Sequence, residues 1–115
     1  MLFIEYPKCT TCKKAKAFLE SLGVKFDDRN IKDNKPTKEE LLEWYKRSNM
    51  PLREMFNTSG LLYKELGLKD KLDEMSDSDK LNLLSTDGML VKRPILVTSK
   101  GVMFGFKEEE WRKIL

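Results

Sequence analysis

LFIEYPKCTTCKKAKAFLESLG, residues 2–23, runs from a short apolar stretch through a turn into an amphipathic stretch. Residues 2–6 are mostly apolar or aromatic, which indicates a buried strand that ends at Pro7. Residues 10–22 predict a helix, closed by Gly23, because apolar side chains recur there at helical spacing. This apolar stripe comprises Cys12, Ala15, Leu19 and Leu22, with Phe18 beside them. The two cysteines therefore stand where a strand gives way to a helix.

The middle of the chain predicts a second strand and then a run of helices. In VKFDDRNI, residues 24–31, alternation places Val24 and Phe26 on one face of a strand. Thr37 and Glu40 have the spacing of a capping box, in which each side chain satisfies an amide at the start of a helix. The expected buried side of this helix is Leu41, Leu42, Trp44 and Tyr45.

After this helix, glycines and a second cap divide the chain. Gly60 and Gly67 break the apolar groups of residues 52–75 and indicate two or three short helices. Ser76, three residues before Asp79, starts another helix that carries Leu81, Leu83 and Leu84.

The C-terminal part predicts a hairpin and a last helix. PILVT and GVMFGF, residues 94–98 and 101–106, have the composition of strands and are joined by a short turn. KEEEWRKIL, residues 107–115, places acids in the first turn of a helix and bases in the last, which suits the helix dipole. The predicted fold class is therefore α/β and thioredoxin-like, with a mixed sheet of about four strands. We expect one domain over residues 1–115, with a helical insertion at about 36–88.

Composition narrows the function. The chain has 115 residues, a net charge of +3 and no histidine, which excludes histidine-based catalysis. Acids and bases are interspersed, so we expect no direct contact with nucleic acid. No stretch reaches the roughly 18 apolar residues that a membrane span needs, and the N-terminus lacks the pattern of a signal peptide. We therefore expect a cytoplasmic monomer without membrane contact.

Cys9 and Cys12 are the candidate reactive residues. Two cysteines three positions apart at the start of a helix lie on nearly the same face. Unpaired amides at the helix N-terminus, together with Lys8, Lys13 and Lys14, favour the thiolate of Cys9. Cys12 begins the apolar stripe and is expected to be buried and protonated. The sequence thus predicts a redox pair in which Cys9 is the nucleophile and Cys12 the resolving thiol.

Two other interpretations of the cysteines remain open. A structural zinc site needs four ligands, which this chain can supply only by dimerising or by using carboxylates. Two inert core cysteines are the second alternative, because free cysteine is often buried. That alternative leaves the position of the pair among lysines unexplained.

Several motifs together resemble a known family. CTTCKKAKAFLE after a short strand, NTSG, KRPILV and GFKEEEWRKIL are similar to the glutaredoxin-related arsenate reductase (ArsC) family, which includes the Spx-type regulators. The resemblance covers essentially the whole chain. It implies a thioredoxin-like fold with an inserted helical segment and a cis peptide bond at Arg93-Pro94.

The resemblance also implies roles for single residues. Cys9 matches the nucleophile of the arsenate reductases, and Arg93 matches one of the three arginines that hold the oxyanion. Asn57 and Phe106 occupy the places of the other two, so we expect poor arsenate reduction. The predicted catalytic residues are Cys9, Cys12 and Arg93, and the predicted substrate-binding residues are Lys8, Thr10, Thr11, Asn57 and Pro94.

NTSG has a second possible role, because Asn57, Thr58 and Ser59 can also cap a helix start. Capping is the favoured role. For Arg93 the alternative role is a surface ion pair.

The resemblance supports two functions. The first is a thiol-dependent reductase without a bound cofactor or metal, which uses an external thiol reductant such as glutathione, glutaredoxin or thioredoxin. The second is an Spx-type redox-sensing regulator that binds the α subunit of RNA polymerase. The family positions that contact polymerase are taken by Pro51 and Ser59, and we expect no C-terminal extension of the Spx kind, so the first function is favoured.

Overall fold

A computed structural model describes all residues from 1 to 115. The four strands are β1 Leu2–Glu5, β2 Asp27–Asn30, β3 Ile95–Thr98 and β4 Gly101–Phe104. The six α-helices are α1 Thr10–Ser21, α2 Lys38–Ser48, α3 Leu61–Glu65, α4 Leu68–Lys71, α5 Asp77–Leu84 and α6 Glu108–Ile114. Three short 3-10 helices complete the chain: η1 Leu52–Met55, η2 Leu72–Glu74 and η3 Gly88–Leu90. Between β2 and β3 the chain forms helices and irregular segments, with one isolated bridge between Phe56 and Val91.

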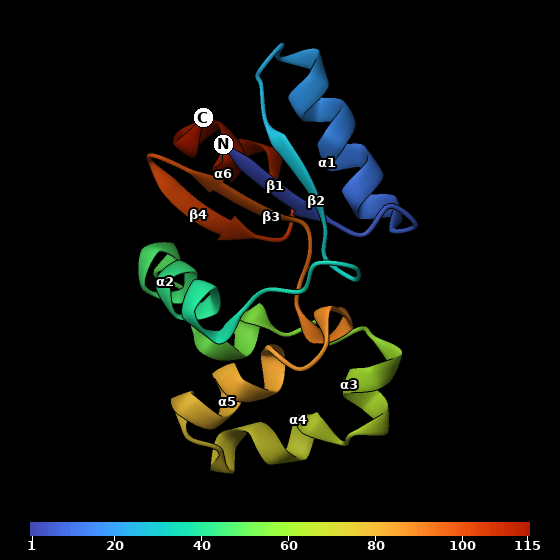
Figure 1. Ribbon diagram of the computed structural model, residues 1–115, viewed down its shortest axis with the longest axis vertical. Helices are drawn as coiled ribbons and strands as arrows, with labels where there is room; N and C mark the ends of the chain where they lie inside the picture. The colour runs from blue at the N-terminus through green and yellow to red at the C-terminus, as the bar shows by residue number, and fades with distance from the viewer.

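The strands form one mixed sheet in the order β2-β1-β3-β4. β1 and β2 run parallel, whereas β3 is antiparallel to both β1 and β4. Figure 1 shows α1 and α6 beside the sheet, while α3, α4 and α5 occupy the opposite end of the molecule. The predicted α/β class with a four-stranded mixed sheet is confirmed.

The two faces of the sheet carry separate hydrophobic cores, because neighbouring strand residues point to opposite faces. Ile4 and Ile95 belong to the first core, which joins the sheet to the helical segment between β2 and β3. Phe3 and Leu96, one position away from these residues, belong to the second core under α1 and α6. The sheet is thus covered on both sides, and the loops at its ends remain available for a site.

Three details of the sequence prediction are wrong. β2 begins only at Asp27, and Val24 and Phe26 precede it as extended chain that packs against the second core. The alternation of apolar and polar residues in this stretch reflects the burial of Val24 and Phe26, not pairing within a strand. Leu22 is 40% exposed, since α1 ends at Ser21 and no longer orients the next residue towards the core. Leu42 is exposed because Leu41 and Trp44 already fill the buried side of α2.

The capping box at the start of α2 is confirmed. The amide of Glu40 donates to the hydroxyl of Thr37, and the amide of Thr37 donates to the Glu40 carboxylate. Arg29 adds a second contact to this carboxylate at 2.7 Å.

We expect Thr37→Ala to lower the free energy of unfolding by about 1 kcal/mol, because the amide of Glu40 loses its acceptor. Thr37→Ser keeps the hydroxyl and should retain most of the stability. Urea unfolding of the two variants measures the difference, and equal losses in both would show that the methyl group, not the cap, contributes the stability.

Candidate functional site

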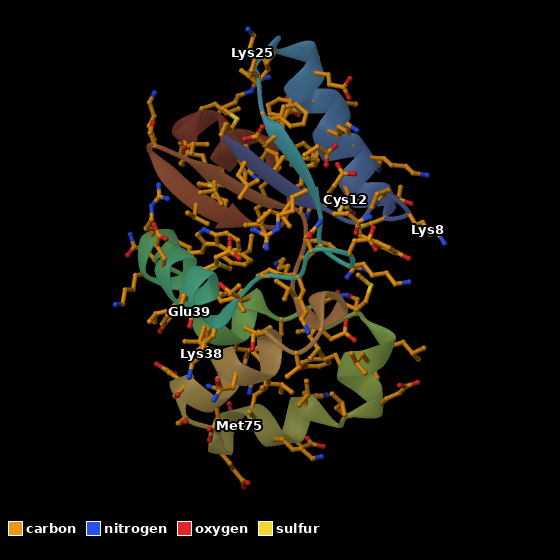
Figure 2. All side chains as sticks on the ribbon, in the orientation of Figure 1. Lys8, Cys12, Lys25, Lys38, Glu39 and Met75 are labelled. Carbon is orange, nitrogen blue, oxygen red and sulfur yellow. The ribbon has the colours of Figure 1, made fainter.

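Cys9 and Cys12 lie where β1 leads into α1. Cys9 is the N-cap of α1, and its amide donates to the carbonyl of Tyr6 at 2.9 Å, which fixes a tight turn. No side chain caps this helix, so the amides of its first turn are directed towards Cys9. Cys9 is half-buried, whereas Cys12 is only 1% exposed. Figure 2 shows Lys8 at the periphery of the molecule and Cys12 further inside.

The surroundings hold the pKa of Cys9 below its ordinary value. Partial burial acts in the other direction and raises this pKa, but hydrogen bonds to the thiolate outweigh the burial. The donors are the backbone amide and the thiol of Cys12, the backbone amide of Thr11 and the guanidinium of Arg93. Cys9 is therefore the more easily ionised of the two thiols.

The pKa of Cys12 is shifted the opposite way, to about 12. Burial is the largest cause, and the Cys9 thiolate adds to it by accepting the thiol proton of Cys12 and by repelling a second negative charge. A hydrogen bond from the Tyr6 amide opposes the shift only in part. Cys12 consequently keeps its proton when Cys9 ionises.

Arg93 connects the cysteines to a pocket. The peptide bond between Arg93 and Pro94 is cis, as expected. The guanidinium lies over the ring of Tyr6, 5.2 Å from its centroid, and helps to lower the pKa of Cys9. Its Nε and Nη1 atoms are buried without any hydrogen-bond partner. Buried donors without partners are rare in proteins, so this guanidinium is suited to an anionic group.

The pocket beside Arg93 has a volume of about 330 Å³. It is lined by Asn57, Gly60, Leu61, Leu62, Glu65, Asp87, Met89 and Arg93. Leu61 is 74% exposed at its rim. Asn57, a predicted binding residue, thus shares the pocket with Arg93.

The other predicted binding residues differ in burial. Lys8, Thr10 and Thr11, next to Cys9 in the sequence, are exposed, and Pro94 is buried. The preferred capping role of the NTSG segment is wrong. The N-cap of α3 is Gly60, which has no side-chain cap, and its amide donates to the carbonyl of Asn57.

Phe106 lies outside the pocket at Arg93. Its ring packs against Trp111 and Phe18 at centroid distances of 4.9 and 5.5 Å, on the side of the second core. The alternative of a surface ion pair for Arg93 is also wrong, since Arg93 forms none. No group of three or more His, Cys, Asp or Glu side chains is arranged to hold a metal ion.

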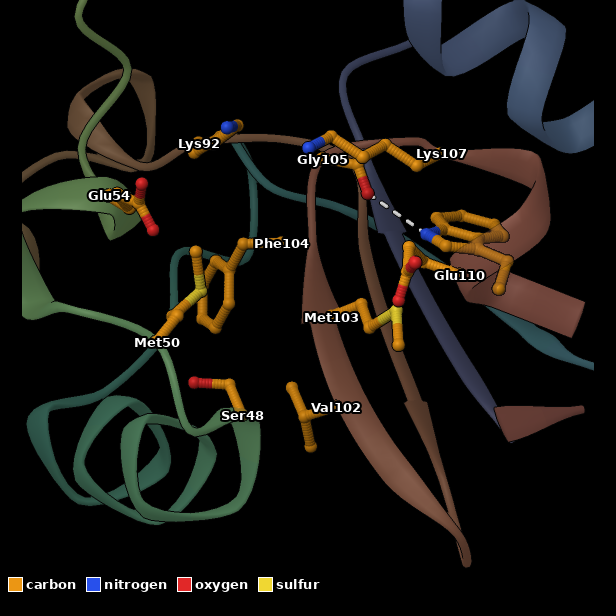
Figure 3. Close-up of a pocket in the computed structure, with 11 residues that line it drawn as sticks. Ser48, Met50, Glu54, Lys92, Val102, Met103, Phe104, Gly105, Lys107 and Glu110 are labelled. Atoms are coloured by element: carbon orange, nitrogen blue, oxygen red, sulfur yellow. Dashed lines mark hydrogen bonds between the residues drawn. The ribbon is translucent and has the colours of Figure 1, made fainter. Parts of the chain in front are cut away.

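A different pocket, of about 280 Å³, opens along β4. In Figure 3 Met50 lies against Phe104, and the indole of Trp111 donates to the Gly105 carbonyl. None of the predicted site residues lines it. Lys92, which was not predicted as a site residue, lines this pocket, whereas its neighbour Arg93 lines the other one.

The sequence analysis did not identify several residues of the site, four of which carry polar or sulfur-containing groups or support Arg93. Tyr6 supports the guanidinium of Arg93 with its ring and the Cys12 sulfur with its amide. Glu65, Asp87 and Met89 line the pocket at Arg93. The aromatic side chain beside Pro7 was a local signal for Tyr6, whereas nothing in the local pattern distinguishes the other three.

The effect of Arg93 on the pKa of Cys9 predicts a change in the pH dependence of alkylation. In Arg93→Met the thiolate loses a cationic donor, so the pKa of Cys9 should rise and alkylation by iodoacetamide near neutral pH should slow several-fold. The two proteins should react at similar rates at alkaline pH, where both thiols are ionised. Arg112→Met, which removes a guanidinium stacked on Phe18, is the matched control. An unchanged profile in Arg93→Met would show that the guanidinium does not stabilise the thiolate.

Comparison with known proteins finds relatives that match almost the whole chain. The sequence matches the ArsC family over residues 4–114. It is 45% identical to YusI of Bacillus subtilis, over 98% of this chain and 96% of YusI. It is 32% identical to the global transcriptional regulator Spx of Streptococcus mutans, over 95% of this chain and 78% of that regulator.

A crystal structure of a possible arsenate reductase from Streptococcus mutans superimposes with a TM-score of 0.88. The identity is 43%, and the match covers 96% of each chain. The thioredoxin-like fold predicted from the sequence is thereby confirmed. None of the helices has the length and apolar character required to cross a bilayer.

Proposed function

The chain belongs to the ArsC family, and from this premise we propose that it is a thiol/disulfide oxidoreductase in which Cys9 attacks and Cys12 resolves. The observation that carries the proposal is the opposite direction of the two pKa shifts. Cys9, the less buried thiol, ionises more easily, and the buried Cys12 keeps its proton. This division suits a nucleophile and a thiol that reacts second.

The first step is the attack of the Cys9 thiolate on one sulfur of a substrate disulfide. A bond forms between Cys9 and that sulfur, the substrate S–S bond breaks, and the other half leaves as a thiolate that takes a proton from water. Arg93 stabilises the attacking thiolate before the step and remains beside the mixed disulfide after it.

The second step is the attack of Cys12 on the sulfur of Cys9. Burial is the main cause of the high pKa of Cys12, and the Cys9 thiolate raises it further. Formation of the mixed disulfide removes this negative charge, so Cys12 ionises more easily before it attacks the Cys9 sulfur. The second substrate thiol then leaves, and two electrons have passed from the cysteine pair to the substrate.

An external thiol reductant, either glutathione with glutaredoxin or thioredoxin, returns the pair to the dithiol. No cofactor or metal takes part. We place the protein in the cytoplasm as a monomer, in keeping with a chemistry that depends on reduced thiols. Arsenate should be a poor substrate, because Arg93 is the only guanidinium among the residues that line the pocket.

A redox titration tests this proposal. The purified protein is equilibrated in glutathione buffers of graded potential, free thiols are alkylated, and the mass is measured. We expect a reversible Cys9-Cys12 disulfide with a potential in the range of about −270 to −120 mV seen in CxxC proteins. A pair that stays reduced across the range, or that forms only glutathione adducts on Cys9, would contradict the resolving role of Cys12.

The second candidate function is a redox-sensing regulator that binds the α subunit of RNA polymerase. The similarity to the Spx regulator over 95% of the chain favours it. A pull-down with purified α subunit separates the two functions. Binding that depends on oxidation of the cysteine pair supports the regulator, whereas thiol-dependent turnover without binding supports the enzyme.

A further inference from the structure

The charged residues of the pocket at Arg93 are of both signs. Arg93 is the single cation, and Glu65 and Asp87 are the two anions. Neither acid forms an ion pair with another side chain. The pocket therefore holds one cation with unmet donors and two carboxylates that have no cationic partner.

Asp87 is held in a fixed position. Its Oδ1 accepts from the amide of Met89 at 2.8 Å, while its other oxygen makes no hydrogen bond within the chain. Asp87 is half-buried and Glu65, at the end of α3, is exposed. One carboxylate therefore lies within the pocket wall and the other at the rim.

This distribution of charge discriminates among ligands. A doubly charged oxyanion would gain one guanidinium and face two carboxylates, so like-charge repulsion opposes its binding. A purely cationic ligand would leave the buried donors of Arg93 unmet. A ligand with an ammonium and a carboxylate on the same carbon satisfies both signs.

The position of Arg93 relates this pocket to the reactive sulfur. Arg93 lines the pocket, and its guanidinium is one of the groups that lower the pKa of Cys9. In cystine, one methylene separates each sulfur from the carbon that bears the ammonium and the carboxylate. A carboxylate held by Arg93 therefore leaves the attached sulfur close to Cys9. The side chains of Leu61, Leu62 and Met89 form apolar walls that suit the methylene.

We propose, on the basis of the thiol/disulfide activity proposed above, that the substrate is a small amino-acid disulfide of the cystine type. Arg93 binds its carboxylate, and Asp87 and Glu65 bind its ammonium. Cys9 forms a disulfide with one half and releases the other as cysteine. Cys12 then forms the Cys9-Cys12 disulfide and releases the second cysteine, so that one cystine is reduced to two cysteines as the protein dithiol is oxidised.

Four small disulfides that differ mainly in charge test this proposal. They are cystine, cystamine with ammonium groups only, 3,3'-dithiodipropionate with carboxylates only, and the neutral bis(2-hydroxyethyl) disulfide. Pre-reduced protein is mixed with an excess of each disulfide, and the reaction is stopped with acid at graded times. The remaining thiols are alkylated, and mass spectrometry measures the fraction of protein that has reacted. Each rate is divided by the rate of the same disulfide with free 2-mercaptoethanol, which corrects for its intrinsic reactivity.

We expect cystine to react about tenfold faster than the other three after this correction, the effect of charge-assisted contacts at both of its charged groups. Asp87→Asn keeps the acceptor for the Met89 amide and removes the charge, and Glu65→Gln removes the charge at the rim. Each should lower the ratio of the cystine rate to the dithiodipropionate rate. Asp70→Asn, the same change on an exposed residue of α4 outside the pocket, should leave this ratio as it is.

The outcomes separate the two proposals. Equal corrected rates for all four disulfides would overturn the proposed substrate class and leave the oxidoreductase in place. A cystamine or dithiodipropionate rate that equals the cystine rate would do the same, as would an unchanged ratio in both pocket variants. No reaction of Cys9 with any disulfide would overturn the proposed function itself, and the substrate class with it.

Discussion

Cys9→Ser is expected to abolish the reaction with every disulfide. A serine hydroxyl has no accessible anion near neutral pH, so the hydrogen bonds that stabilise the Cys9 thiolate have no nucleophile to act on. The thiol of Cys12 cannot replace Cys9, because it is only 1% exposed and burial is the largest cause of its raised pKa. The measurement is the rate of disulfide consumption by pre-reduced protein.

Cys12→Ser is the matched comparison for this experiment, since it makes the same substitution at the second cysteine. Cys9 should still attack, but the mixed disulfide has no resolving thiol and should accumulate. Mass measured without reductant detects it as an adduct on Cys9. Substantial turnover by Cys9→Ser, or the absence of an adduct in Cys12→Ser, would show that the two roles are assigned wrongly.

Gly88→Ala is expected to have the largest effect on stability of the changes considered. A Cβ at position 88 would lie 2.8 Å from the carbonyl carbon of Ile31 and closer still to its oxygen. Both atoms belong to the backbone, so no side-chain rotation relieves the clash and one of the two segments must move. We expect a loss of about 3 kcal/mol in the free energy of unfolding, measured by urea denaturation.

Gly67→Ala provides the control for this substitution. Gly67 has a φ of +64°, but an added Cβ would meet nothing closer than 3.9 Å. Its expected cost is about 1 kcal/mol, from the left-handed backbone alone. Equal losses in the two variants would show that the contact between Gly88 and Ile31 relaxes easily. Because η3 precedes Arg93 by a few residues, the alkylation profile of Cys9 in Gly88→Ala should also move towards higher pH.

The features predicted correctly from the sequence are those with local signals. The capping box of Thr37 and Glu40 and the hairpin of β3 and β4 depend on residues a few positions apart. The different burial of Cys9 and Cys12 follows in the same way from their positions at the start of one helix. In these cases the local backbone determines the structure, and distant contacts only add to it.

The features that were missed depend on contacts between distant segments. Glu65 and Asp87 lie far apart in the sequence and line the same pocket because α3 and η3 pack together. The burial of Val24 and Phe26 against the second core imitates the alternation of a strand. The residues around Gly88 and around Ile31 contain no sequence signal that predicts the close approach of their backbones. Such features follow from tertiary packing, which the spacing of residues in one segment does not determine.

The two covered faces of the sheet have a consequence for spectroscopy. The chain contains two tryptophans, and Trp44 lies in the first core while Trp111 lies in the second. In the variants Trp111→Phe and Trp44→Phe a single indole therefore reports on one side of the sheet. Coincident fluorescence transitions would identify one cooperative unit, whereas separate transitions would show that the helical segment loosens independently of α1 and α6. Intrinsic fluorescence thus resolves the unfolding of each layer without an added label.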